Sequence, residues 1–255
     1  MTITKRDDVV SLRRRWTIYA VGLLAVSSLP ALSANPASKS DSKPVPPPAT
    51  KGVVVLFSGT KADMEKNWVR GGGDQPAAWR IEDGAMIATG SDIRSRDRFS
   101  DFQLHVEFRV PYMPEAHGQA RGNSGVYLQG RYEIQVLDSY GIESPGTGDC
   151  GAIYGQAAPL VNACRPPMEW QTYDVFFRAA RFDPNTGDET EPPRVTVLQN
   201  GIAIQNNEAI RGGTGGRRRA GERPEGPILL QFHDNAVAYR DIWVVPLPPK
   251  GADHY

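Results

Sequence analysis

Strict alternation of apolar and polar residues is the feature that most limits the folds open to this chain. In FQLHVEFRV, residues 102–110, nearly every second side chain is apolar, and a period of two places these side chains on one face of a β-strand. Apolar runs also flank Asp83-Gly84 and Asn200-Gly201. Both pairs favour tight hairpin turns, because the two central residues of such turns need positive φ. The pattern predicts strands with one buried face, joined into antiparallel hairpins.

Other parts of the chain extend this prediction. Further strands are expected at residues 53–57, 125–129, 132–137, 172–179, 228–232 and 238–244. No stretch between residues 53 and 247 shows helical periodicity over more than two turns. Many short strands joined by Gly-, Pro- and Asn-rich turns are typical of a sandwich or jelly roll. A closed barrel is the alternative, but the irregular segment 139–169 suits a sandwich better. We therefore predict an all-β fold, a jelly-roll β-sandwich with a single domain.

The ends of the chain are predicted to lie outside this domain. Residues 1–34 combine the consecutive arginines at 13–15, an apolar run and small residues, the three parts of a secretory signal peptide. A retained anchor is the alternative, but about 14 apolar residues are fewer than the roughly 20 of a helical span. Residues 35–51 form a Pro/Ser-rich linker, residues 52–248 the sandwich and residues 249–255 a tail. An exported protein, periplasmic or extracellular, is expected, without a stable membrane span in its mature form.

The charge of the chain argues against nucleic acid as a partner. Lys and Arg number 29, as do Asp and Glu. Loss of residues 1–34 removes five basic and two acidic residues, which leaves 24 against 27, a net charge of −3. A mildly acidic protein has no general attraction for a polyanion. The one basic cluster, residues 217–219, lies in a Gly-rich stretch and is interpreted as a loop.

Two cysteines are present, Cys150 and Cys164. In an exported protein a lone pair most often forms a disulfide. Closing a loop of about 15 residues would stabilise the fold by roughly 3 kcal/mol in the chain-entropy model. A metal-binding pair is the alternative, but no His or further Cys stands at ligand spacing. We expect a disulfide that closes a long loop.

Candidate site residues lie in GNSGVYLQGRYEIQVLDSYG, residues 122–141. Alternation places Ile134 in the core and Glu133 and Gln135 on the opposite face. Tyr127, in the preceding strand, also faces away from the core. If the two strands pair, these polar groups and the aromatic ring form a patch that suits a sugar. A solvated outer sheet face is the alternative interpretation.

Several motifs together resemble a known family. Residues 122–141 are followed, in order, by GDCGAIYG, EWQTYDVFFRAARF, VTVLQNG and ILLQFHDNAVAYRDIWVVPL. This series resembles the 3-keto-disaccharide hydrolase domain family over residues 53–247. The resemblance implies a concanavalin A-like jelly roll and an enzyme that cleaves the glycosidic bond of 3-keto-glycosides or disaccharides, as a hydrolase or as a lyase and hydratase. The strand at 195–199 lacks the His that many relatives carry before the Asn-Gly pair.

The chemistry that the resemblance implies needs one base. A ketone at C3 acidifies the C2 proton; its removal gives an enolate that expels the aglycone from C1, and water then adds back. Ordinary glycoside hydrolysis instead uses two carboxyl groups, about 5.5 Å or 6.5–9.5 Å apart. Glu133 is the expected catalytic base. His233, which shares a strand face with Gln231, is the second catalytic candidate.

The remaining expectations concern the substrate and a cofactor. The expected substrate contacts are Asn123, Tyr127, Arg131, Gln135 and Tyr154. Asp138 is the candidate metal ligand, which with Glu133 or His233 could hold a divalent metal ion, the one cofactor considered. A carbohydrate is the expected partner. The alternative function is a non-catalytic, lectin-like glycan-binding module of the cell envelope; a third is an interaction domain without sugar chemistry.

Overall fold

The structure is a computed structural model that describes residues 52–217 and 221–248. The predicted signal peptide (1–34), linker (35–51) and C-terminal tail (249–255) lie outside the described residues, as do residues 218–220 of the Gly/Arg-rich segment. Among the helices that are described, none has the length and apolar character required to cross a bilayer.

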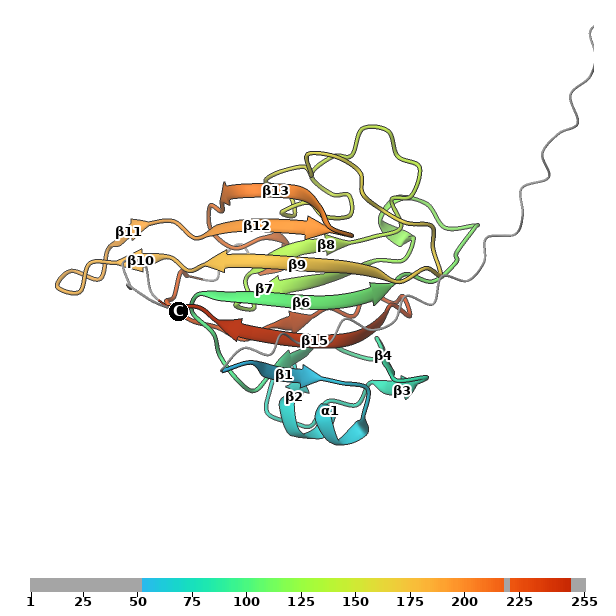
Figure 1. Cartoon of the computed structure of the whole chain (residues 1–255), viewed down its shortest axis with the longest axis horizontal. Helices are drawn as coiled ribbons and strands as arrows, with labels where there is room; N and C mark the ends of the chain where they lie inside the picture. Colours follow the sequence, from blue (N-terminus) through green and yellow to red (C-terminus); the bar gives the residue numbers. More distant parts are fainter. Residues whose placement is uncertain (1–51, 218–220, 249–255) are drawn as a thin grey trace, which may run out of the picture. The chain divides into compact units, whose positions relative to one another are not determined.

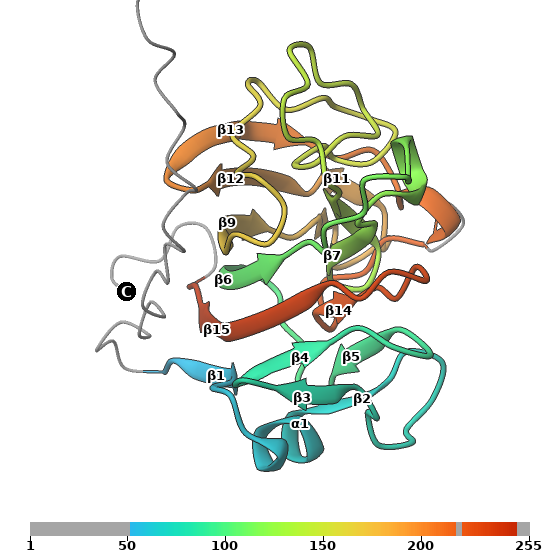
Figure 2. The same ribbon diagram turned by 90° about the vertical axis from the view of Figure 1, so that its right-hand side faces the viewer.

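Two antiparallel sheets pack face to face, which confirms the predicted all-β sandwich (Figures 1 and 2). The larger sheet has the order β13-β12-β9-β6-β15-β4-β3, and β1 also pairs with β15. Its strands are β1 (Val54–Phe57), β3 (Arg80–Glu82), β4 (Ala85–Ile87), β6 (Phe102–Arg109), β9 (Gln171–Arg178), β12 (Arg194–Gln199), β13 (Ile202–Ala209) and β15 (Ala238–Pro246). The smaller sheet has the order β2-β5-β14-β7-β8.

The remaining elements are short. The strands of the smaller sheet are β2 (Trp68–Arg70), β5 (Ile93–Ser95), β7 (Ser124–Leu128), β8 (Tyr132–Val136) and β14 (Leu229–Leu230). A separate two-stranded ribbon joins β10 (Arg181–Phe182) to β11 (Glu189–Glu191). The helices are α1 (Lys61–Asn67) and the 3₁₀ turns η1 (Gly118–Ala120) and η2 (Gly215–Arg217). The sequence did not predict α1, whose seven residues bury only Met64 and so give almost no periodic signal.

The alternation in β6 builds the core as predicted, but its polar face is buried too. Phe102, Leu104 and the other apolar residues of β6 are fully buried between the sheets. On the opposite face, His105 is only 1% exposed, because its ring stacks on Trp243 at 5.0 Å and its Nδ1 lies 2.7 Å from Asp174. Burial opposes the charged imidazole, but hydrogen bonds with acidic neighbours raise its pKa to about 9. Pairing with charged neighbours thus makes this burial tolerable.

Both predicted hairpin turns are present. Asp83 and Gly84 have φ angles of 49° and 75° and join β3 to β4. Asn200 and Gly201 have φ angles of 53° and 81° and join β12 to β13. Positive φ at both positions is the conformation that these residue pairs were expected to adopt. Between β8 and β9 the chain runs through the long irregular segment expected from the sequence.

Candidate active site

The site is organised by the pairing of β7 with β8. In their register Glu133 faces Tyr127, and Gln135 faces Gly125. A Cβ atom at position 125 would lie only 2.6 Å from Glu133 Oε1 and 3.0 Å from Tyr127 Cε2. Contacts this short do not occur, so position 125 must be glycine for the carboxylate to lie against the sheet. The sequence pattern Gly-x-Tyr followed by Glu therefore creates the space for one buried carboxylate.

Two loops close the outer edge of β8. The loop before η2 contributes Thr214, whose Oγ1 accepts a 2.7 Å hydrogen bond from the Glu133 backbone N–H. Thr214 N–H in turn donates to Arg131 O at 3.0 Å. From the other loop, Tyr154 N–H donates to Glu133 O at 3.1 Å. An edge strand normally offers unpaired backbone groups, and here those groups fix the two loops beside the carboxylate.

A cavity of about 150 Å³ opens over this part of the small sheet. Both predicted catalytic residues, Glu133 and His233, lie in its wall. Four of the five predicted substrate contacts also lie there, the exception being Arg131. The complete lining is Gln119, Asn123, Tyr127, Glu133, Gln135, Tyr154, Gly215, Gly216, Gln231 and His233.

Glu133 supplies the one carboxyl group in the lining of this cavity, and the pKa of that group is raised. It is 3% exposed, and burial raises its pKa to about 7, against the lowering effect of a 2.7 Å hydrogen bond donated by Tyr127 Oη to Oε2. The negative charge of Asp92 raises it further. The Gln135 amide is assigned with its nitrogen 3.1 Å from Glu133 Oε1 and 2.9 Å from Ser124 O, because in this orientation the nitrogen donates a hydrogen bond to each oxygen. A carboxylate of this pKa can take up a proton near neutral pH.

Four residues of the lining were not among the predicted site residues: Gln119, Gly215, Gly216 and Gln231. Gln231 Nε2 donates to Tyr127 Oη at 3.3 Å, while its buried Oε1 has no hydrogen-bond partner in the described structure. Its position two residues before His233 on one strand face was the available signal. Gln119 lies in η1, and Gly215 and Gly216 lie in η2; single 3₁₀ turns have no periodicity to reveal them. A Cβ atom at Gly215 would lie 3.1 Å from Glu133 Oε2, so this glycine lets the loop approach the carboxylate.

Arg131 and Asp138 lie outside the lining of this cavity. Arg131 lies in the turn between β7 and β8, where its Nη2 donates to Arg223 O at 2.9 Å. Asp138 forms an ion pair with Arg121 at 3.2 Å and is not part of the cavity wall. Within residues 52–217 and 221–248, no group of three or more His, Cys, Asp and Glu side chains could hold a metal ion. Asp138 is paired with Arg121, and its role as a metal ligand stays a prediction.

The two cysteines lie side by side as free thiols. Gln199 Nε2 is 3.6 Å from the sulfur of Cys150 and 3.4 Å from that of Cys164. A hydrogen bond with Cys150, together with burial, raises the pKa of the Cys164 thiol. The expected disulfide is thus not formed in this structure, although the folded chain brings its two partners together. The bond stays a prediction.

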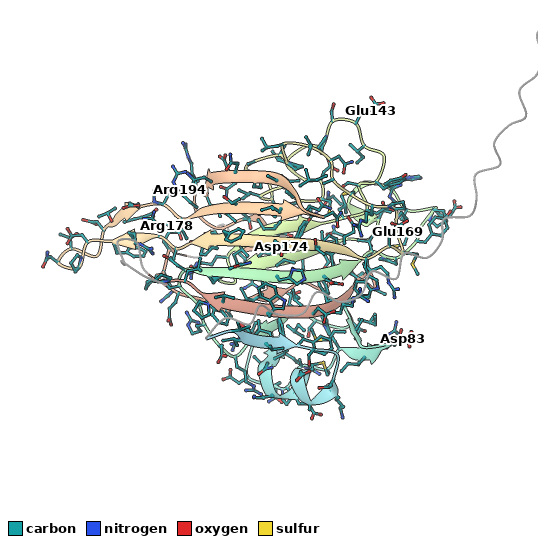
Figure 3. The ribbon with its side chains drawn as sticks, in the orientation of Figure 1. Asp83, Glu143, Glu169, Asp174, Arg178 and Arg194 are labelled. Carbon is teal, nitrogen blue, oxygen red and sulfur yellow. The ribbon has the colours of Figure 1, made fainter. Side chains whose placement is uncertain are left out.

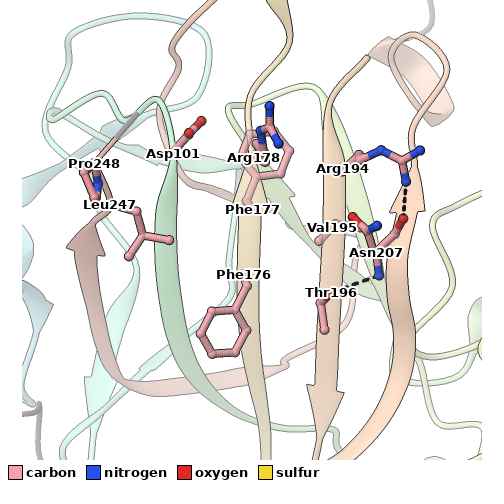
Figure 4. A pocket seen from close by; sticks show the side chains of 10 residues that line it. All are labelled: Asp101, Phe176, Phe177, Arg178, Arg194, Val195, Thr196, Asn207, Leu247 and Pro248. Carbon is pink, nitrogen blue, oxygen red and sulfur yellow. Dashed lines mark hydrogen bonds between the residues drawn. The ribbon is translucent and has the colours of Figure 1, made fainter. Parts of the chain in front are cut away.

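A second hollow, of about 300 Å³, crosses β9 and β12 of the larger sheet (Figure 4). Figure 3 labels Arg178 and Arg194, two of its lining residues, on that sheet. Asp101 is the one carboxylate in its lining, and it already accepts hydrogen bonds from Arg181 and from Ala179 N–H. The one carboxylate of the hollow is thus already paired, so the cavity around Glu133 is the better candidate for catalysis.

Comparison with known proteins agrees with this architecture. Residues 52–245 match the family described as the 3-keto-alpha-glucoside-1,2-lyase-like domain. A protein from Parabacteroides distasonis ATCC 8503, provisionally described as a glycosyl hydrolase, is 38% identical, with a TM-score of 0.70 over 77% of this chain and 84% of that chain. A second protein from the same organism, described in the same way, is 20% identical, with a TM-score of 0.53 over 77% of this chain and 94% of that chain. At this identity the likeness shows the fold alone. No curated protein gave a significant match.

Replacement of Glu133 by Gln should stabilise the protein at alkaline pH. The folded-state pKa of about 7 exceeds the ordinary value of 4.5, so this group's contribution to stability falls as pH rises from about 4.5 to 7. Glu133→Gln removes the charge and keeps the shape. We expect the variant to gain about 1–3 kcal/mol in denaturant unfolding at pH 8 and nothing at pH 4.5.

The exposed Glu143, labelled in Figure 3, provides the matched control. Glu143→Gln should leave the unfolding free energy unchanged at both pH values. A loss of stability in Glu133→Gln at pH 8 would show that the buried carboxylate is favourably paired there, against our assignment.

Proposed function

The chain belongs to the 3-keto-alpha-glucoside-1,2-lyase-like domain family, a carbohydrate-active domain related to glycosyl hydrolases, and on this premise we propose that it cleaves the glycosidic bond of 3-keto-glycosides. One observation supports this most directly. A single buried carboxylate, with a pKa of about 7, faces a small polar cavity that also contains a histidine. Elimination next to a ketone needs one such base, whereas ordinary glycoside hydrolysis needs two carboxyl groups. The cavity wall contains only one.

The proposed reaction has two halves. Glu133 removes the C2 proton, and the electron pair of that C–H bond forms the enolate of the C3 ketone. The ketone then re-forms as a C1–C2 double bond appears and the C1–O bond breaks. The aglycone leaves with a proton from His233, which gives an enone. Water then adds to C1 and returns a proton to His233, while Glu133, whose carboxyl proton has by then exchanged with solvent, protonates C2. The sum is hydrolysis.

The neighbouring polar groups have distinct tasks in this scheme. Tyr127 Oη holds Glu133 Oε2 and so orients the carboxylate. The unpaired Oε1 of Gln231 can accept a hydrogen bond from a sugar hydroxyl, since a buried acceptor without a partner is costly to leave unsatisfied. Asn123 N–H donates to Asn235 at 2.9 Å, which fixes the wall of the cavity on the side of η1.

The role of Glu133 predicts a specific loss of turnover. Glu133→Gln should lower kcat on a 3-keto-glucoside by about 10²–10⁴-fold, the range for general-base catalysis, and leave binding largely intact. In the wild type, the acidic limb of the kcat/KM profile should rise with pH through a midpoint near 7, because the base acts only when deprotonated. Steady-state kinetics and calorimetric binding provide the two measurements.

Glu143→Gln should behave like the wild type in both assays. If the wild type binds oxidised and unoxidised glycosides alike and turns over neither, the lectin-like alternative replaces the enzyme.

A test of metal dependence distinguishes between two roles of Glu133 and His233, as acid–base groups or as ligands of a metal ion. The proposed steps use protein groups, since the described residues include no cluster of three or more acidic, His or Cys side chains. Dialysis against a chelator should therefore leave kcat/KM within about twofold of its starting value. A loss that a divalent ion restores would instead assign Glu133 and His233 to a metal ion.

We also propose that the protein acts after export. The arginine-rich start, short apolar run and small residues of segment 1–34 are the basis for this. When the whole chain is expressed in a Gram-negative host, mass spectrometry of the periplasmic fraction should find a protein that begins close to Asn35. Full-length protein found only in the cytoplasm would contradict export.

A further inference from the structure

The cavity around Glu133 is too small for a complete glycoside. Its volume of about 150 Å³ is below the roughly 300–1,000 Å³ typical of sites for small ligands. It therefore suits little more than the oxidised ring whose C2 proton Glu133 would remove. The glycosidic oxygen connects that ring to an aglycone, which must lie outside this cavity. This reasoning rests on the proposed function.

A neighbouring hollow of about 380 Å³ offers the additional space. Its lining is Tyr112, Met113, Pro114, Arg121, Asp138, Tyr140, Pro166 and Pro167. The chain around η1 supplies residues to both places, because Gln119 and Asn123 line the cavity and Arg121 lines the hollow. The chain at the end of β8 does the same through Gln135 and Asp138. These two segments therefore border both the cavity and the hollow.

Specific contacts hold these two segments together. Asp138 N–H donates to Arg121 O at 3.1 Å, and Arg121 Nη2 donates back to Asp138 O at 2.9 Å. Between them, Gly122 has a φ of 64°, and a Cβ atom there would lie 3.0 Å from Val110 Cβ and 3.4 Å from Asp138 Cβ. The close packing requires glycine at position 122. The ion pair therefore serves to hold the boundary of the hollow in place.

The chemistry of the lining favours an aromatic ligand. Tyr112 is 67% exposed and Tyr140 52% exposed, and both line this one hollow, so their rings belong to a contiguous apolar patch of the kind that marks a binding site. Three prolines and a methionine add further apolar surface, and the only charged groups are Arg121 and Asp138, which pair with each other. A second sugar ring would need several hydrogen-bonding groups around its rim, whereas a flat aromatic ring can stack on tyrosine.

We propose that this hollow is the aglycone site and that it selects 3-keto-glycosides with a flat aromatic aglycone over 3-keto-disaccharides. Part of the hollow is built by the long segment between β8 and β9, which forms loops at one end of the sandwich; Figure 3 labels Glu143 and Glu169 within it. Loops carried by a rigid sandwich are where binding specificity is commonly located.

The test compares two substrates that differ only in the aglycone, phenyl 3-keto-glucoside and methyl 3-keto-glucoside. Because phenol leaves more readily than methanol, the informative quantity is the change in the phenyl-to-methyl ratio of kcat/KM between variant and wild type. Tyr112→Ala and Tyr140→Ala should each lower this ratio about 5- to 10-fold, the value of one aromatic contact. Both side chains are exposed, so their removal should leave the fold intact.

Leu160→Ala is the matched control, since Leu160 is an exposed apolar residue of the same long segment and lies outside both linings. Its ratio should stay within about twofold of the wild type. Turnover of both substrates with an unchanged ratio in both tyrosine variants would overturn the aglycone site and leave the proposed function standing. Turnover of neither substrate by the wild type would overturn the proposed function and, with it, the aglycone site.

Discussion

The account depends on the close packing of the Glu133 carboxylate against Gly125 and Tyr127. Without a side chain at position 125, Oε1 can lie where a Cβ atom would come within 2.6 Å. This position removes the carboxylate from water and raises its pKa to about 7. Charge burial of this kind costs stability, and the hydrogen bond from Tyr127 offsets only part of the cost. Such a residue is better explained by a role in proton transfer than by stabilisation of the fold.

The rest of the site supports this carboxylate from two sides. Below it, the core residues of β7 and β8 fix the strands. Beside it, Thr214 and Tyr154 attach two loops to the backbone of β8. The loops narrow the cavity to about the space for one ring, which leaves the aglycone to lie outside it.

Much of the fold could be predicted from the sequence, because alternation and the two hairpin pairs are local signals. The face that carries Tyr127, Glu133 and Gln135 followed from the same period of two. Arg131 lies outside the cavity lining because it is in a turn, where Gly130 has a φ of 65° and alternation no longer specifies a direction. Gln119 could not be found, since its position depends on how a long loop packs onto the sheet. The burial of His105 could not be predicted from the sequence either, because its partners come from separate strands.

The central claim, that Glu133 removes the C2 proton, is tested most directly by proton NMR of the reaction in D₂O. The account predicts that the 3-keto-glucose released from a 3-keto-glucoside carries deuterium at C2, since hydration of the enone places a solvent-derived deuteron there. Exchange without enzyme, measured in parallel over the same short time, sets the background. A product that retains its original proton at C2 above that background would show direct cleavage at C1 and contradict the account.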